Sequence, residues 1–441
     1  MILRKKHLAS AIIALALCCN YSVAQQPLVV QAKKVITATG QTIENGTVVC
    51  VDGKIKAIGK TGEVTIPEKA TIVQSEVAMP GMIDVRTCAG LSGILNVDHD
   101  SDHIESSSPL QPELRALDAY NPREELVEYI RSFGVTTIHT GHAPGELMSG
   151  QTLIAKTVGN SIEEALLVDG RAIAATLAES SSKSGKSSPG TRGKQMAMLR
   201  ALFIEATELQ TKIDAKANPK PAEKSATDKS DKSDKSKDSD KSKDSDKEKT
   251  PEPVARNLRL EAVMQVLAGK KALLITADRA QDIASAIRLA EEFKIQIWLD
   301  SAADAHLMIP QIKAAGISVL LHPSMARASG EKENQSFLTA SKLRAAQIPF
   351  AIQGGFEPYV PKVRVVLFEA AIAAAHGLSY DAAIESITIS PARILGIQDR
   401  VGSLEVGKDA DLALYDGDPL EYTTHCVGVI INGKIVSTTV R

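Results

Sequence analysis

The second half of the chain alternates between two apolar patterns, and this alternation constrains the fold more than any other feature. Short, continuously apolar segments such as KALLITA at 271–277 predict strands that are buried on both faces. Segments such as AQDIASAIRLAEEF at 280–293 place apolar residues three and four positions apart, which predicts helices with one buried face. Strands that alternate with helices form a parallel sheet covered by helices. We expect strands at 132–141, 271–277, 295–300, 317–323 and 348–355, and helices at 259–269, 280–293, 306–316 and 339–347.

The two ends of the chain have a different pattern. Residues 27–60 and 402–437 read as short strands separated by turn sequences such as Asn-Gly and Asp-Gly. We expect these distant segments to pair into one small β lobe. A length of 441 residues suits one large α/β domain with such a lobe attached.

Residues 1–24 have the pattern of a secretory signal peptide. Three basic residues at 4–6 precede an apolar run at 8–17, and a Ser-Val-Ala sequence ends at Ala24. The apolar run is too short to cross a bilayer as a helix that rises about 1.5 Å per residue. We therefore expect cleavage after Ala24, export to the periplasm or the extracellular space, and no membrane span in the mature protein.

A segment of different composition interrupts the α/β part at about 212–253. Its centre is nearly all Lys, Asp and Ser, with nine basic and nine acidic residues between 221 and 250. Such a segment has little apolar surface to bury, and its charges cancel, so we expect a disordered, solvated insertion. The expected division of the chain is 1–24 for the signal peptide, 25–78 and 401–441 for the lobe, and 79–400 for the α/β part.

Export would place Cys50, Cys88 and Cys426 in an oxidising compartment. Cys50 and Cys426 both fall in the expected lobe, so a disulfide between them is one interpretation. Three unpaired, buried thiols are the interpretation that we favour.

The overall charge argues against a nucleic-acid partner. The chain has 51 Lys and Arg residues against 53 Asp and Glu residues, and only 3% of its residues are aromatic. Nucleic-acid surfaces use excess positive charge and, for single strands, aromatic stacking. We expect no nucleic-acid binding.

Several longer motifs resemble one enzyme superfamily. The sequences VAMPGMID, PELRALDAYNP, GVTTIHTGHAPGELMSGQT and TISPARILGIQDRVGSLEVGKDADLALYDGDP are similar to those of amidohydrolases, near the imidazolonepropionase-like members. The similarity covers nearly everything outside the signal peptide and the insertion. It implies an α/β fold: a (β/α)8 TIM barrel with a small β-sandwich formed by both ends of the chain. Active members hydrolyse C–N bonds with one or two divalent metals at the C-terminal face of the barrel.

The resemblance also implies where metal ligands would belong. Active members use a His-x-His pair on the first barrel strand, histidines on the fifth and sixth strands, and an aspartate on the eighth. In this chain those positions hold Arg86 and Cys88 on the first strand, Thr276 on the fifth with Asp278 two residues on, Ser301 or, one residue earlier, Asp300 on the sixth, and Gly355 on the eighth.

These substitutions predict a degenerate site without a metal cofactor. The permanently charged guanidinium of Arg86 would repel a divalent cation. Metal-activated water would then be lost, and we expect Arg86 to bind a carboxylate or similar anion instead. Cys88 shares a strand face with Arg86, but no general base accompanies it, so we do not expect thiol catalysis.

The loop VDHDSDH at 97–103 contains the remaining cluster of metal-ligand types. His99 and His103 are its histidines. We interpret the loop as solvated and polar, and a metal site at His99 and His103 is the alternative, because such residues need a scaffold to fix coordination geometry.

His139 and His142 lie at a strand end and are candidates for the pocket, although their spacing of three keeps them off one strand face. Lys156 is interpreted as a surface lysine, with a remnant of the carbamylated lysine of some family members as the alternative. His322 is interpreted as structural or surface.

Two functions remain open. In the first, the protein is an exported pseudoenzyme that binds a small molecule, expected to be anionic, or assembles as a homo-oligomer or with an active paralogue. In the second, it is an active hydrolase of C–N bonds in amides or cyclic amidines, with zinc or another divalent metal.

Overall fold

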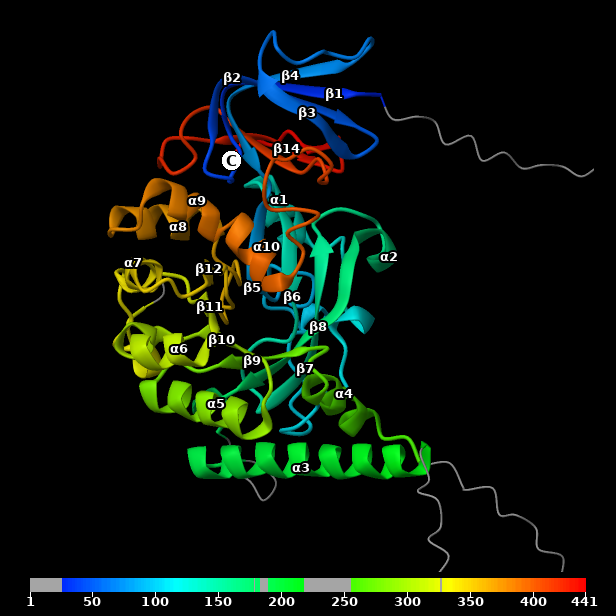
Figure 1. Cartoon of the computed structure of the whole chain (residues 1–441), viewed down its shortest axis with the longest axis vertical. Helices are drawn as coiled ribbons and strands as arrows, with labels where there is room; N and C mark the ends of the chain where they lie inside the picture. Colours follow the sequence, from blue (N-terminus) through cyan, green and yellow to red (C-terminus); the bar gives the residue numbers. More distant parts are fainter. Residues whose placement is uncertain (1–25, 178, 183–188, 218–254, 326) are drawn as a thin grey trace, which may run out of the picture.

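The computed structural model describes residues 26–177, 179–182, 189–217, 255–325 and 327–441. Eight strands form a barrel-like sheet in which β5 to β12 are neighbours in chain order (Figure 1). A bridge between Thr87 and Gly355 links the ends of the first and last strands, so the sheet is nearly closed, as the expected barrel requires. The strands are β5 (Met82–Thr87), β6 (Val135–Thr140), β7 (Met148–Lys156), β8 (Leu166–Thr176), β9 (Ala272–Thr276), β10 (Ile297–Ser301), β11 (Ser318–Leu321) and β12 (Phe350–Ile352).

Helices cover the outside of this sheet (Figure 1). The helix expected at 280–293 is present with those bounds, and its buried Ile283, Ala286 and Ile287 recur at a spacing of three and four. The helices are α1 (Glu125–Ser132), α2 (Ile162–Ala165), α3 (Arg192–Ala217), α4 (Leu258–Leu267), α5 (Ala280–Phe293), α6 (Ile309–Ala315), α7 (Thr339–Ala345), α8 (Val366–Ala375), α9 (Tyr380–Ser386) and α10 (Ile389–Leu395).

The barrel departs from regular strand–helix alternation at β7. This strand runs antiparallel to both β6 and β8, whereas the other neighbouring strands pair in parallel. Only residues 141–147 connect β6 to β7, and residues 157–165 connect β7 to β8. A parallel return needs a crossover of about a dozen residues or more, so these short connections impose hairpins.

The lobe is a seven-stranded sheet built from both ends of the chain, as expected. Along strand β13 the side chains alternate: Leu412 and Leu414 join the apolar cluster of the lobe, while Ala413 and Tyr415 join the core of the barrel. The lobe is therefore packed onto the barrel by one of its own strands. In sheet order its strands are β3 (Lys54–Lys60), β2 (Thr42–Val51), β1 (Leu28–Ile36), β4 (Thr71–Pro80), β13 (Leu412–Tyr415), β14 (Cys426–Ile431) and β15 (Lys434–Ser437).

One expected boundary needs correction. Helix α3 continues through Ala217, so residues 212–217, which we expected to belong to the insertion, are helical. Residues 218–254 and the predicted signal peptide lie outside the described residues. Cys50, Cys88 and Cys426 are buried and unpaired, which confirms the interpretation that we favoured.

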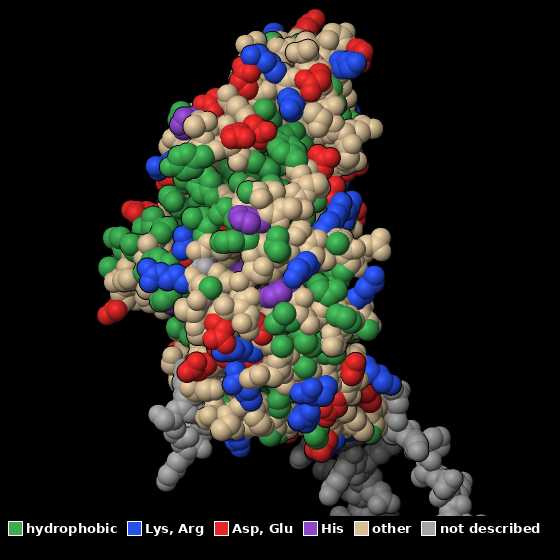
Figure 2. All heavy atoms as spheres, turned by 90° about the vertical axis from the view of Figure 1, so that its left-hand side faces the viewer, with side chains coloured by type: hydrophobic (Ala, Val, Ile, Leu, Met, Phe, Trp, Pro, Cys, Tyr) green, Lys and Arg blue, Asp and Glu red, His purple; other side chains and the backbone are tan. Residues whose placement is uncertain are grey.

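The surface that carries α7 to α9 is rich in apolar side chains. Figure 2 shows hydrophobic side chains gathered on this side of the molecule, between more charged regions above and below. Phe368 on α8 and Leu338 before α7 are among the exposed large hydrophobic residues. Across the part of the chain that the structure describes, no helix is both long and apolar enough to cross a membrane.

Candidate functional site

A cavity of about 620 Å³ opens at the C-terminal ends of the parallel strands. This is the end of a barrel at which active sites are built. Thr276, Asp300 and Ser301 line the cavity from the ends of β9 and β10, and Gly355 lines it from the segment after β12. The sequence-predicted positions therefore converge on one place, because parallel strands present their ends at the same side of the sheet.

Arg86 lies just below this cavity and is held by protein acceptors on several sides. Its Nη1 donates to the carbonyls of Thr87 and Gly141 at 3.4 Å, and its Nη2 donates to the carbonyl of His142 at 2.5 Å. Its Nε lies 3.4 Å from Asp300 Oδ2. Only 4% of the Arg86 side chain is exposed, so the guanidinium is a buried link between strands.

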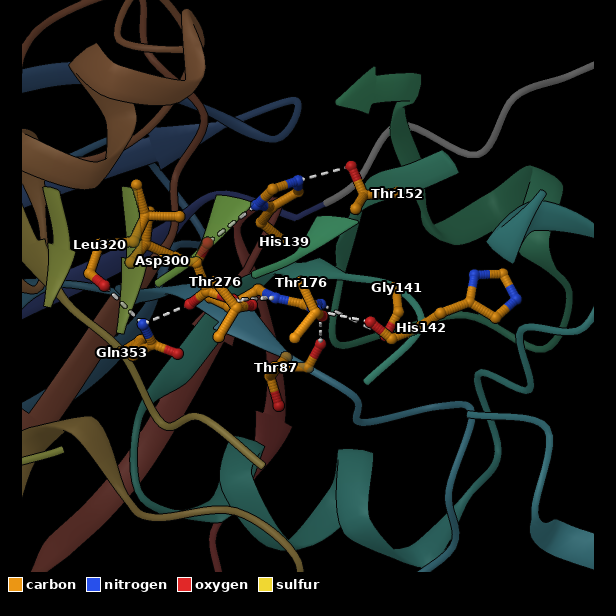
Figure 3. A network of polar contacts seen from close by, with 12 residues as sticks. Thr87, His139, Gly141, His142, Thr152, Thr176, Thr276, Asp300, Leu320 and Gln353 are labelled. Carbon is orange, nitrogen blue, oxygen red and sulfur yellow. Dashed lines mark hydrogen bonds and ion pairs between the residues drawn. The ribbon is translucent and has the colours of Figure 1, made fainter. Parts of the chain in front are cut away.

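Asp300 is the centre of this polar network (Figure 3). Its Oδ2 also accepts from Thr276 Oγ1 at 2.6 Å, and its Oδ1 accepts from Gln353 Nε2 at 2.8 Å. Gln353 also donates to the carbonyl of Leu320 at 2.6 Å. Of the two alternatives for the sixth strand, Asp300 is therefore the residue that contacts Arg86. Its charge is balanced by one cation and two neutral donors, which is the compensation that a buried carboxylate needs.

The residues at the expected metal positions do not fit a metal ion. A guanidinium, a hydroxyl and a carboxamide surround the one carboxylate there, and these groups donate hydrogen bonds to Asp300 rather than leaving it free to coordinate. Nowhere among the described residues do three or more His, Cys, Asp or Glu side chains form a group that could hold a metal ion. Active sites of this kind need at least three protein ligands.

Asp84 supports the same site from beneath and was not singled out by the sequence. Its Oδ1 accepts from the backbone N–H of Gly354 at 2.9 Å and of Arg86 at 3.2 Å. Burial raises the pKa of Asp84 to about 7. A Cβ at Gly354 would lie 2.3 Å from Asp84 Oδ2, so this close approach requires glycine. Asp84 lies two residues before Arg86, so the alternation of a strand places both side chains on one face, and this was the available signal.

Cys88 faces the same narrow space as Arg86, as its strand position predicted. Burial raises the pKa of its thiol to about 12, and its Sγ lies 3.3 Å from Ser92 Oγ. The thiolate needed for nucleophilic attack is therefore disfavoured.

The two histidines near the strand end have different surroundings. His139 is a core residue: its Nδ1 donates to the carbonyl of Val85 at 2.8 Å and its Nε2 accepts from Thr152 at 2.7 Å. Burial lowers its pKa to about 3, so the ring is neutral. His142 contributes its carbonyl to Arg86, while Figure 3 shows its ring directed away from the Asp300 network. Neither imidazole joins the site.

The loop at 97–103 also stays apart from the network. His99 is exposed and lies 3.8 Å from Asp100. His103 packs its ring against Phe356 with 5.0 Å between ring centroids. No group of metal-ligand side chains forms around either histidine within the described residues.

Lys156 is neither a surface residue nor part of the site. It pairs with Thr137 at the start of β6, so it lies at the opposite end of the strands from the cavity. Its Nζ is buried between Asp409 Oδ2 at 2.8 Å and Asp411 Oδ2 at 2.9 Å. Both interpretations of Lys156 were wrong, because the antiparallel direction of β7 turns this residue toward the lobe.

Asp278 and Ser301 face the cavity without joining the Arg86 network. Asp278 accepts from the backbone N–H of Ala303 at 3.1 Å. Ser301 has a left-handed backbone with a φ of 68°, and its Oγ has no hydrogen-bond partner among the described residues. His322, which follows β11, is fully buried rather than exposed. Gly355 offers no side chain, and its N–H donates to the carbonyl of Arg86 at 3.0 Å.

Comparison with known proteins finds similarity to amidohydrolases. A model described as "Amidohydrolase family" matches residues 365–437. The chain is 26% identical over 415 residues to "Amidohydrolase tasK" of Hapsidospora irregularis, an alignment that covers 89% of this chain and 39% of that protein. It is 28% identical over 149 residues to an imidazolonepropionase of Fusobacterium nucleatum, covering 31% of this chain and 36% of that protein. The chain thus spans well under half the length of these two curated relatives.

A solved structure supports the fold across nearly the whole chain. The structure of an amidohydrolase from Thermotoga maritima MSB8 superposes with a TM-score of 0.78 and 23% sequence identity. The superposition covers 93% of this chain and 100% of the other.

Proposed function

We propose that this chain, which is similar to amidohydrolases in sequence over residues 365–437 and in fold, is an exported member of their superfamily that has lost metal-dependent hydrolysis and uses its barrel to bind a small molecule. Export rests on the pattern of residues 1–24, and places the mature protein in the periplasm or outside the cell. Mature protein that begins at Gln25 on N-terminal sequencing would support this part of the proposal, and an intact Met1 would contradict it.

The observation that carries the proposal is the set of contacts around Arg86. Metal-dependent hydrolysis needs a cation that activates water and polarises a carbonyl. Here a fixed positive charge occupies the first-strand position, and the sixth-strand carboxylate of Asp300 is bound to it. A divalent cation at this place would meet a like charge and would have to displace the guanidinium from Asp300.

The molecule can still bind a ligand, because a cavity lies beside the Arg86–Asp300 network. A volume of about 620 Å³ lies within the range of small-molecule sites. The sequence suggested that Arg86 would bind an anion. Because Nε, Nη1 and Nη2 of Arg86 all donate to protein acceptors, we assign ligand recognition to the side chains that line the cavity instead.

Assembly is the second part of the proposal, and the apolar face of α8 supports it. Phe368, Ala371, Ile372 and Ala375 are exposed or half-buried and recur at helical spacing, which forms an apolar stripe. Such a stripe suits a homo-oligomer or a complex with an active paralogue. Light scattering of the purified protein tests the first option: we expect a dimer or larger species, and a monomer at high concentration would contradict it.

The alternative function is hydrolysis of C–N bonds in amides or cyclic amidines with zinc or another divalent metal. This alternative is supported by the similarity to proteins that are named as an amidohydrolase and an imidazolonepropionase. Mature protein incubated with a panel of N-acyl amides and cyclic amidines, with and without added zinc, separates the two functions. We expect no turnover above heat-denatured protein, whereas turnover that disappears with a chelator would favour the alternative.

A further inference from the structure

The floor of the cavity contains a carboxylate without a counter-ion. Asp278 follows β9, lines the cavity and has only 4% of its surface exposed. Its Oδ1 accepts from the N–H of Ala303, and no Lys, Arg or His of the described residues forms an ion pair with it. By contrast, the cavity carboxylates of Asp300, Glu331 and Glu357 are paired with Arg86, Arg192 and Arg364. A buried charge is costly unless a partner compensates it, so a cationic ligand group could form a favourable ion pair with Asp278.

Two further polar atoms nearby also have no partner. Ser301 lines the same cavity, is 6% exposed, and its Oγ makes no hydrogen bond to the described residues. His322 follows the neighbouring strand β11, and its backbone N–H donates to the carbonyl of Ser301 at 2.9 Å. Its Nδ1 donates to the carbonyl of Pro323, which leaves Nε2 as an acceptor without a partner. Buried polar groups are normally satisfied, so these atoms are open to a partner from outside the chain.

Most of the charged side chains in the wall of the cavity are acidic. Five carboxylates line the cavity, against Arg327 and Lys332. Arg327 is exposed and Lys332 only half-buried, so both retain contact with water, whereas Asp278 lies at the buried floor. The deep part of the cavity therefore favours a positive group, and the two cations would meet the outer part of a ligand.

From these observations we infer that the cavity binds a small molecule through a protonated primary amine, with Asp278 as its counter-ion and Ser301 as a second hydrogen-bond partner. The inference rests on the proposed ligand-binding function and assigns its ligand class. An ammonium group has three donors and no acceptor. The Asp278 carboxylate and Ser301 Oγ both accept hydrogen bonds, and both residues line the cavity. Within the described residues, Asp278, Ser301 and His322 belong to no group of side chains that could hold a metal ion.

Three matched probes separate the charge of the ligand from its apolar chain: 1-aminobutane, 1-butanol and butyrate. Binding to the mature protein is measured by saturation-transfer NMR, with dissociation constants from titration. We expect 1-aminobutane to bind more tightly than the other two. Asp278→Asn keeps an acceptor for Ala303 but removes the charge, so it should weaken amine binding about tenfold or more, as for loss of a charged hydrogen bond.

Ser301→Ala should weaken amine binding by a smaller factor, and Glu63→Gln, an exposed carboxylate of the lobe, should leave it unchanged. Circular dichroism confirms that each variant is folded. Preferred binding of butyrate, equal binding of all three probes, or an unchanged amine affinity in Asp278→Asn would overturn the amine inference while leaving ligand binding intact. Absence of binding by every probe would overturn both.

Discussion

Arg86 Nε and Asp300 Oδ2 lie 3.4 Å apart and join β5 to β10 across 214 positions of sequence. Both side chains are almost completely buried, at 4% and 2% exposure. Asp300 also accepts from Thr276 and Gln353, so one carboxylate connects β5 and β9 with the segment after β12. The pair therefore holds together the strand ends at which the superfamily would place a metal.

Replacing Arg86 with Met should destabilise the barrel. The substitution leaves the Asp300 carboxylate buried without its cation, and breaking a buried pair from one side costs about 3–5 kcal/mol. Urea unfolding followed by the fluorescence of Trp298 measures the change, because the chain has one tryptophan and it is buried in β10.

The matched control for that variant is Arg115→Met, which removes an ion pair of 3.0 Å between half-exposed Arg115 and Asp169. Exposed pairs contribute about 1 kcal/mol or less, so its unfolding free energy should change little. Equal effects of the two substitutions would contradict a special role for Arg86.

Lys156→Met should weaken the attachment of the lobe to the barrel. Lys156 contacts Asp409 and Asp411. The substitution would leave the buried Asp411 without a cation, whereas Asp409 keeps Lys54 and Arg400. We expect a loss of about 3–5 kcal/mol in unfolding free energy, as for other broken buried pairs. The exposed pair of Lys33 with Glu76, at 2.7 Å, provides the comparison. If Lys33→Met were as destabilising, burial of the Lys156 network would not explain its effect.

Glu369 should make stability depend on pH. Burial raises its pKa from 4.5 to about 7 in the folded protein. The folded state therefore binds a proton more strongly than the unfolded state between about pH 4.5 and 7, and this contribution to the unfolding free energy falls as pH rises through that window. Glu369→Gln removes it, so the variant should gain stability relative to the natural protein on going from pH 5 to 7.5.

The difference in unfolding free energy between the variant and the natural protein isolates the effect of Glu369, because the other groups with shifted pKa values are common to both. Glu128→Gln, at an exposed position of α1, controls for loss of a carboxylate. A pH-independent difference between Glu369→Gln and the natural protein, measured by urea unfolding at each pH, would refute the assignment.

The regular part of the fold could be predicted because its pattern is local. Helix α5 was expected with its observed bounds, since its apolar residues repeat at the helical period. The direction of β7 could not be predicted in this way, because an apolar strand has the same pattern in either direction. Only the short connections of β7 determine that it runs antiparallel to its neighbours. Helix α3 extends beyond residue 212, where the composition changes, because Lys and Ala are good helix formers even where no face is buried.

The site could be predicted in position but not in its contacts. Strand order placed Arg86, Thr276 and Asp300 at one end of the sheet, and the structure places them in contact. The hydrogen bonds of the Arg86 guanidinium could not be predicted in the same way. Two of its acceptors are the carbonyls of residues 141 and 142, which lie in the hairpin connection into β7. Gln353 carried a detectable signal, because it is a polar residue at the end of an apolar strand.

We propose that Arg86 takes the place of the metal. The most direct test is the metal content of mature protein, residues 25–441, purified without a metal-binding tag, incubated with excess zinc, desalted and analysed by elemental mass spectrometry. We predict folded protein with far less than one equivalent of zinc, nickel, iron or manganese per chain. One equivalent or more, retained through desalting, would contradict the account and would direct attention back to His99 and His103.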